Sequence, residues 1–476
     1  MPSSLPSESP EVLGTILSDI DNLLMEDLRA HITNVLEGWR RYKRNSRFRF
    51  CDHTSVIHLF SMLWRAAFLL ATAAAAACGH VVRYDGYRVY RLLPADEEQL
   101  HLLAGLDQFH EDIQFWKEAK AVNKPVDVMV SPRIQDAFLE MIQIYGMEAA
   151  VYVDNVQKLI DNERGFRRQG ESFGWDDYYN LTEIHAWLNS LSETYPDTVT
   201  LVVGGSSYEG REILGVNITF APGNPIVVIE GGIHANEWIG PASVTWFVNQ
   251  MLTTNDTAIS NVVRQFNFYV FPNLNPDGYE YTWTTDRNWR RTRTPYSPCY
   301  GADPNRNWDF HWAEEGANTT GCTNYFAGPA PFSEVETRTY SQFLASLGDD
   351  FQLYLDFHSY GQMLMFPYGL SSLVAPNYDE LLEIAGRAAE VLASRYGTQF
   401  TYGSIVDTIY PAAGSSIDWL MGVQGKRFPF AWELRDTGEF GHLLPADQIV
   451  PTSEETFDSV LSVLNDVLAL VQRDRS

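Results

Sequence analysis

A histidine and a glutamate with HxxE spacing directly follow a strongly apolar segment of the chain. The segment PIVVIEGG (225–232) runs into IHANEWIG, which carries His234 and Glu237. Imidazole and carboxylate groups are suitable zinc ligands, and a catalytic zinc ion commonly takes three protein ligands plus water. Because chance matches to HxxE are frequent, the pair predicts a metal site only together with a third ligand.

The candidate for this third ligand is His358. It ends another apolar segment, FQLYLDFH (351–358), and the strand ends of an α/β sheet are where binding sites form. A closely spaced ligand pair with a remote histidine is also a common layout of catalytic zinc. Taken alone, a histidine at a strand end is more often simply hydrogen-bonded, so ligation by His358 is a hypothesis at this point.

Apolar strand-like segments alternate with amphipathic ones over residues 169–476. Strands are expected at 198–207, 225–232, 267–275 and 351–359, where β-branched and aromatic runs are typical of strands buried on both faces. Helices are expected at 241–252, 334–347 and 378–397. A last helix is expected to begin at Thr452, because Glu455 completes a capping-box pattern there. This alternation predicts one α/β domain over 169–476.

Residues 80–168 have a different pattern, in which short strand-like and helical segments follow the order βαββαβ. That order predicts a small ferredoxin-like α+β unit. It is followed by the polar stretch VQKLIDNERGFRRQGES, which includes Arg164, Arg167 and Arg168. Exposed basic residues in a linker are candidate cleavage sites for a trypsin-like protease. A solvated connecting helix is the other interpretation, and the two are compatible.

The segment that begins at Met62 reads MLWRAAFLLATAAAAACGH. One positive charge, Arg65, precedes a short apolar run and an alanine-rich zone, which predicts a secretory signal peptide over 62–79. A buried alanine-rich helix is the alternative, and the run falls short of the ~20 residues that cross a bilayer. Residues 1–61 are then interpreted as a start-site artefact or a disordered extension. A longer isoform with an internal signal-anchor is the competing explanation.

Export would also decide the state of the cysteines. Signal cleavage removes Cys51 and Cys78, and the remaining Cys299 and Cys322 are expected to form a disulfide in a secreted chain. The formal net charge of −27 argues against nucleic acid or an anionic membrane surface as a partner. Lys426 is the only lysine in 169–476; this scarcity suggests a gut lumen as a hypothesis, with compositional drift as the alternative.

Motifs spread over the whole 169–476 region resemble those of one family. In chain order they are HANEW (234–238), NPDGY (275–279), WRRTR (289–293), DPNRNW (303–308), HSY (358–360), YGSI (402–405), IYPAAGSSIDW (409–419) and ELRDTG (433–438). They resemble the zinc metallocarboxypeptidases of the pancreatic A/B type, and 80–168 resembles their activation propeptide. The resemblance implies a doubly wound mixed α/β sheet, a zinc ion on His234, Glu237 and His358, and a zymogen that hydrolyses the C-terminal bond of peptides.

The same motif matches imply roles for further residues. Glu433 matches the catalytic glutamate, which takes a proton from zinc-activated water and passes it to the leaving amine. Arg290 matches the arginine that stabilises the developing oxyanion, and Asp303 matches the carboxylate that orients the first zinc histidine. The groups that match the binding site of the substrate's terminal carboxylate are Asn305, Arg306 and Tyr410. A bidentate pair with Arg306 would make the enzyme an exopeptidase.

The position that selects the C-terminal side chain in this family corresponds to Ile417. Members that select lysine or arginine have an acidic residue there, whereas Ile417 is apolar and the matching pocket residues Met365, Ile405 and Ala412 are uncharged. Burying an unpaired cation is costly, so aromatic or large aliphatic C-terminal residues are expected. Asn236 departs from the frequent HxRE pattern, which puts binding at the neighbouring subsites in doubt. A non-catalytic relative is the leading rival hypothesis, and the presence of both Glu433 and Arg290 disfavours it. An enzyme of the same fold that accepts a basic C-terminal residue is a second rival, which Ile417 disfavours.

Overall fold

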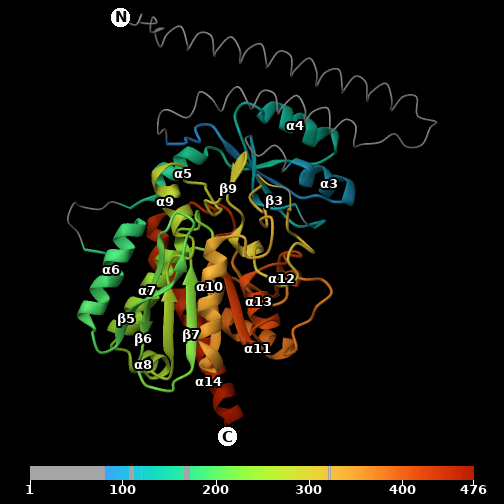
Figure 1. Ribbon diagram of the computed structural model, residues 1–476. Helices are drawn as coiled ribbons and strands as arrows, with labels where there is room; N and C mark the ends of the chain where they lie inside the picture. Colours follow the sequence, from blue (N-terminus) through green and yellow to red (C-terminus); the bar gives the residue numbers. More distant parts are fainter. Residues whose placement is uncertain are drawn as a thin grey trace, which may run out of the picture. The chain divides into compact units, whose positions relative to one another are not determined.

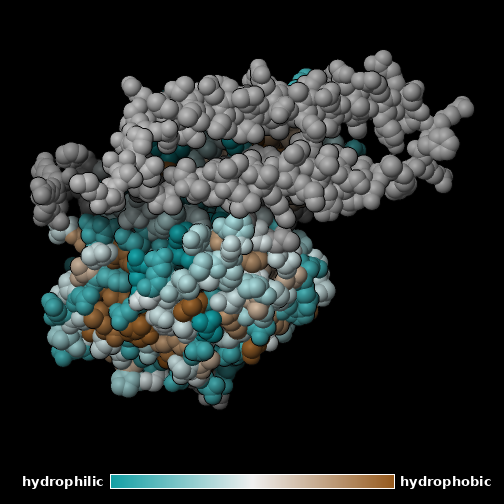
Figure 2. All heavy atoms as spheres, turned by 45° about the horizontal axis from the view of Figure 1, so that its top comes forward, coloured by the Kyte–Doolittle hydropathy of each residue, from teal (hydrophilic) through white to brown (hydrophobic). Residues whose placement is uncertain are grey.

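The computed structural model describes residues 81–106, 112–119, 121–165, 172–319, 321 and 323–475. The segment 1–61, the predicted signal peptide, Arg167, Arg168 and Cys322 lie outside the described residues. Within the described part, no helix is both long and apolar enough to cross a membrane. The coloured surface in Figure 2 is largely hydrophilic, with smaller groups of hydrophobic residues between, in keeping with the many charged residues of the chain.

The first part of the described chain is a four-stranded antiparallel sheet with helices. Its elements are β1 (Arg88–Leu92), α3 (Glu97–Gly105), β2 (Ile113–Lys117), β3 (Val126–Val130), α4 (Gln135–Ile144) and β4 (Ala150–Val153). The sheet order β2-β3-β1-β4 is that of the predicted ferredoxin-like unit, which is confirmed. Helix α5 (Val156–Glu163) follows, and the Asn155 side chain accepts a hydrogen bond from its first turn.

The second part is built on one eight-stranded mixed sheet with the order β13-β12-β14-β11-β7-β8-β6-β5. Its strands are β5 (Val199–Ser206), β6 (Glu212–Ile218), β7 (Ile226–Gly231), β8 (Asn267–Phe271), β11 (Phe351–His358), β12 (Met363–Phe366), β13 (Thr401–Ser404) and β14 (Phe428–Glu433). The central strands β14, β11, β7 and β8 run parallel, so their carboxyl ends lie at one edge of the sheet. The short strands β9 (Pro295–Tyr296) and β10 (Cys299–Tyr300) form a separate ladder.

Helices pack on both faces of this sheet, as expected for a doubly wound fold (Figure 1). Buried side chains of α6 (Leu181–Thr194), α7 (Ile239–Thr253), α11 (Tyr378–Tyr396) and α14 (Ile449–Arg475) join the core of one face. Side chains of α10 (Val335–Ser346) and α13 (Ser416–Gly422) join the core of the other. The remaining α-helices in the described part of this domain are α8 (Thr257–Val263), α9 (Pro276–Thr284) and α12 (Ile405–Thr408).

Side-chain alternation along β11 decides which residues reach which face. Leu353, Leu355 and Phe357 join the core beneath α7 and α14, whereas Tyr354 joins the core beneath α10 and α13. Asp356 and His358 share the parity of Tyr354 and therefore point to the α13 side.

The last helix begins earlier than the sequence predicted. Helix α14 starts at Ile449 rather than at Thr452, so the predicted capping box is wrong. Pro451 falls within the first turn, where a missing N–H costs no hydrogen bond and the fixed φ suits a helix. Glu455 instead accepts a hydrogen bond from Arg435 Nε at 2.6 Å.

Candidate active site

The three predicted zinc ligands meet at the carboxyl edge of the central strands. His234 and Glu237 lie in the loop between β7 and α7, and His358 is the last residue of the neighbouring parallel strand β11. Their ligand atoms lie within 4.8 Å of one another. His358 Nδ1 is 3.1 Å from His234 Nδ1 and 3.1 Å from Glu237 Oε2, and His234 Nδ1 is 2.8 Å from Glu237 Oε1. Nδ1 of both histidines and the Glu237 carboxylate thus face a common point.

The outward nitrogen of each of these imidazoles faces a buried carboxylate. Asp303 Oδ1 lies 3.1 Å from His234 Nε2, in the arrangement predicted from the sequence. Asp356 Oδ2 lies 2.8 Å from His358 Nε2. Carboxylates in these positions hold Nδ1 free to bind a metal. Two imidazoles and one carboxylate, all buried, fit the donor set and the three-ligand layout of a catalytic zinc ion.

Sequence reasoning missed Asp356, although the signal was present. An aspartate inside a run of apolar residues needs a buried partner, and residues two apart on a strand point to the same face. The segment YLDFH therefore places a carboxylate beside the side chain of His358.

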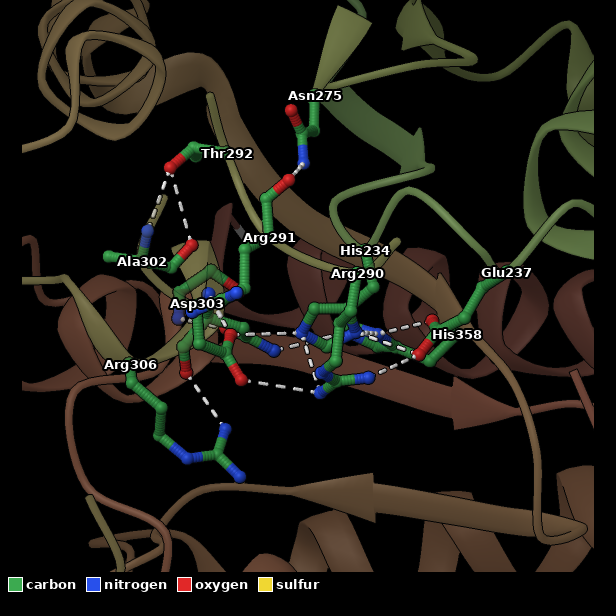
Figure 3. Close-up of polar contacts among 12 residues, drawn as sticks. His234, Glu237, Asn275, Arg290, Arg291, Thr292, Ala302, Asp303, Arg306 and His358 are labelled. Atoms are coloured by element: carbon green, nitrogen blue, oxygen red, sulfur yellow. Dashed lines mark hydrogen bonds and ion pairs between the residues drawn. The ribbon is translucent and has the colours of Figure 1, made fainter. Parts of the chain in front are cut away.

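Arg290 bridges the carboxylates of this cluster, as Figure 3 shows. Its guanidinium donates to Glu237 Oε1 at 2.8 Å and to Asp303 Oδ2 at 3.3 Å. Although burial lowers it, the pKa of Arg290 is raised on balance by the charges of Asp303 and Glu237. Burial likewise opposes ionisation of Asp303, but Arg290 and His234 hold the pKa of Asp303 well below its usual range. A fixed cation therefore lies beside the three ligands.

Glu433 is the last residue of β14 and the ladder partner of His358 on β11. Among the described residues, no hydrogen-bond partner reaches its buried Oε2. Burial raises the pKa of Glu433 to about 8, and the nearby Glu237 adds to this while His358 opposes it. A cation bound by the three ligands would lower this pKa again. A buried carboxyl oxygen without a hydrogen-bond partner among the described residues therefore lies beside the three ligands.

The residues predicted to hold a terminal carboxylate also come together. Asn305 Oδ1 accepts a hydrogen bond from the Ser416 backbone N–H at 2.9 Å, and Arg306 Nη1 donates to the Asn305 carbonyl at 2.9 Å. Glu118, from the ferredoxin-like unit, lies 3.9 Å from Arg306 Nη2. Burial and then the charge and hydrogen bonding of Glu118 raise the pKa of Tyr410 well above its usual value. We call Asn305, Arg306 and Tyr410 the carboxylate cradle. A carboxylate of the chain itself thus lies against the cradle.

The predicted pocket residues form one buried apolar group on the α13 side of the sheet. Ile417 is 1 % exposed and belongs to the same core cluster as Met365, Ile405 and Ala412. These residues come from β12, α12, α13 and the loop before α13. The wall at Ile417 is therefore apolar, as the sequence indicated.

The ferredoxin-like unit contacts residues around the metal ligands at further points. Asp127 accepts a hydrogen bond from Tyr360 Oη at 2.8 Å, and Trp116 packs edge-on against His442 with 5.8 Å between ring centroids. Glu163 pairs with Arg287, whose Nη1 also donates to the carbonyl of Asn236, the residue before Glu237, at 2.9 Å. These partners are far apart in sequence, so no local pattern could have revealed them.

Comparison with known proteins then decides the family. Residues 184–459 match the family model described as zinc carboxypeptidase. The chain belongs to the zinc carboxypeptidase family. Residues 90–163 match the model of the carboxypeptidase activation peptide. The ferredoxin-like unit is therefore an activation segment, and this zinc carboxypeptidase is made as a zymogen that acts on peptides after proteolytic activation.

Named relatives agree with this assignment over most of their length. Zinc carboxypeptidase A 1 of Anopheles gambiae is 43% identical over 413 residues, covering 85% of this chain and 95% of the relative. Carboxypeptidase B of Astacus astacus is 44% identical over 297 residues, covering 62% of this chain and 98% of the relative. The crystal structure of carboxypeptidase A from Helicoverpa armigera aligns with a TM-score of 0.73 at 25% identity, covering 82% and 99%. Because A-named and B-named relatives both match, the side-chain preference has to be argued from the pocket.

Proposed function

We propose that the activated enzyme removes single aromatic or large aliphatic residues from the C-termini of peptides. The observation that carries this preference is the apolar wall at Ile417, beside a carboxylate cradle. Apolar surface gains roughly 25 cal/mol per Å² on burial, whereas a lysine or arginine side chain would need a facing carboxylate. Oδ2 of the neighbouring Asp418 accepts from the Gly369 backbone N–H at 2.9 Å, and burial raises the pKa of Asp418 to about 7, which disfavours its charged form.

The cradle residues position the substrate in this proposal. Arg306 forms a bidentate ion pair with the terminal carboxylate, while the Asn305 amide and the Tyr410 hydroxyl add hydrogen bonds. Fixing the terminus in this way presents the last peptide bond to the three-ligand site and excludes internal bonds. This arrangement supports an exopeptidase.

The chemical step then falls to Glu433 and Arg290. His234, Glu237 and His358 would hold a zinc ion, which would act as a Lewis acid on the attacking water and the scissile carbonyl. Glu433 takes a proton from the attacking water and delivers it to the leaving amine as the carbon–nitrogen bond breaks. Arg290 donates hydrogen bonds to the oxygen on which negative charge develops.

Inhibition of the precursor is assigned to the activation segment, because its Glu118 lies beside Arg306 and Tyr410. A trypsin-like protease is proposed to cleave near Arg167 or Arg168. The leader at 62–79, secretion, a gut lumen as the site of action and the Cys299–Cys322 disulfide belong to the same proposal. They rest on the sequence, since the leader and Cys322 lie outside the described residues.

The test is hydrolysis of two blocked dipeptides that differ only in ending with Phe or Arg. The full-length protein is assayed before and after trypsin treatment, with and without a zinc chelator. We expect chelator-sensitive cleavage of the Phe substrate after trypsin only. Preference for Arg would overturn the pocket assignment, and equal activity before cleavage would overturn the inhibitory role of the activation segment.

A further inference from the structure

Asp356 lies on β11 two residues before the proposed zinc ligand His358 and on the same face of the strand. It is 0 % exposed, and its Oδ2 accepts from His358 Nε2 at 2.8 Å and from the Ser416 hydroxyl at 3.2 Å. Neither the motif matches nor the zinc ligand set assigns it a role. A fully buried carboxylate is costly unless it is paired, so its retention in the sheet requires an explanation.

The surroundings direct the charge of Asp356 towards His358. Among the described residues, Asp356 forms no ion pair with lysine or arginine, whereas Asp303 shares its charge between His234 and Arg290. Glu230 faces Asp356 across the β7–β11 ladder. Burial and then the charge of Asp356 raise the pKa of Glu230 well above its usual range.

We infer that Asp356 is a positioning residue for zinc, because it holds the Nε2–H of His358 and thereby turns the Nδ1 lone pair towards the metal. This inference rests on the proposed ligation by His358. A carboxylate behind a zinc-bound imidazole fixes its tautomer and ring orientation and raises its basicity. With Asp303 behind His234, both zinc histidines of this chain then have a buried carboxylate behind them.

The experiment measures zinc affinity of the full-length protein rather than peptidase activity. Competition with a chromogenic chelator at fixed pH gives the zinc dissociation constant of the wild type and of Asp356→Asn, Asp356→Ser, Glu230→Gln and His358→Ala. Removal of such a carboxylate typically weakens metal binding by about 10- to 100-fold, and we expect this for both Asp356 variants. Glu230→Gln keeps the shape of a buried side chain whose oxygens hydrogen-bond none of the proposed ligands among the described residues, so it should leave the zinc affinity unchanged.

Thermal unfolding of the metal-free proteins separates positioning from general stability. A loss of zinc affinity in Asp356→Asn with an unchanged metal-free Tm supports the inference. If affinity is unchanged in both Asp356 variants but lost in His358→Ala, the inference fails while the proposed ligand set stands. If His358→Ala keeps wild-type affinity, the proposed ligand set itself fails. An equal loss in Glu230→Gln would also overturn the inference, since a disturbed core would then explain the effect.

Discussion

The buried ion pair between Glu163 and Arg287 predicts how tightly the activation segment is held. Arg287 Nε donates to Glu163 Oε2 at 2.7 Å, and its Nη2 donates to the other carboxylate oxygen. The two side chains are only 1 % and 6 % exposed. The change to test is Glu163→Gln, which keeps the shape of the side chain and removes its charge.

The size of the effect follows from what Arg287 retains. Its other N–H groups donate to the carbonyls of Asn236 at 2.9 Å and His442 at 3.1 Å, so the cation stays fixed in the interface after the substitution. Breaking a buried pair from one side costs roughly 3–5 kcal/mol. Burial raises the pKa of Glu163 despite Arg287, and glutamine can still accept one hydrogen bond, which favours the lower end. A loss of about 3 kcal/mol weakens binding of the segment about 100-fold.

The assay follows release of the segment after the linker is cut. Trypsin-treated protein is diluted, and recovery of activity on the Phe dipeptide gives the dissociation rate of the cut segment. The matched control is Asp154→Asn, because the Asp154–Arg88 pair lies in the same segment but is exposed and contributes little. The reasoning is refuted if Glu163→Gln releases the segment no faster than this control.

Further predictions concern the site and the core. Glu433→Gln should lower kcat by about 10²- to 10⁴-fold without changing the zinc content measured by atomic absorption. Because Glu433 must be ionised to accept a proton, kcat/KM should rise with pH through its pKa, with a midpoint below the metal-free value of about 8 once zinc is bound; a profile that falls over this range would contradict the assignment. Arg306→Lys should raise KM for free C-termini far more than for esterified ones, because the planar bidentate pair is lost. Burial raises the pKa of Glu336 to about 8, so its contribution to stability is fully present below the unfolded pKa near 4.5 and declines as pH rises through about 8. Urea titrations should show Glu336→Gln losing less stability than the wild type between these pH values.

The sequence predicted those features whose causes are local. His234 and Glu237 follow an apolar strand and His358 ends one, and parallel neighbouring strands bring such ends together. The place of Asp356 beside His358 was also predictable, because residues two apart on a strand point to the same face. The Glu163–Arg287 pair was not predictable, because its members are 124 residues apart and meet only when the activation segment packs on the peptidase. The predicted start of α14 was wrong. Thr452 and Glu455 fit a capping box locally, but the Glu455 carboxylate accepts a hydrogen bond from Arg435 instead, a contact that only the tertiary structure creates.

The carboxylate of Glu118 beside Arg306 resembles the C-terminal carboxylate of a peptide substrate. Glu118 presents a carboxylate to Arg306, and every peptide C-terminus carries the same functional group. Under the proposed function, the segment and the substrate would therefore compete for one site. Once the linker is cut, a high concentration of peptide ends captures the enzyme whenever the segment leaves and prevents it from returning. The onset of activity after cleavage then depends on how much digestible peptide surrounds the enzyme as well as on the activating protease.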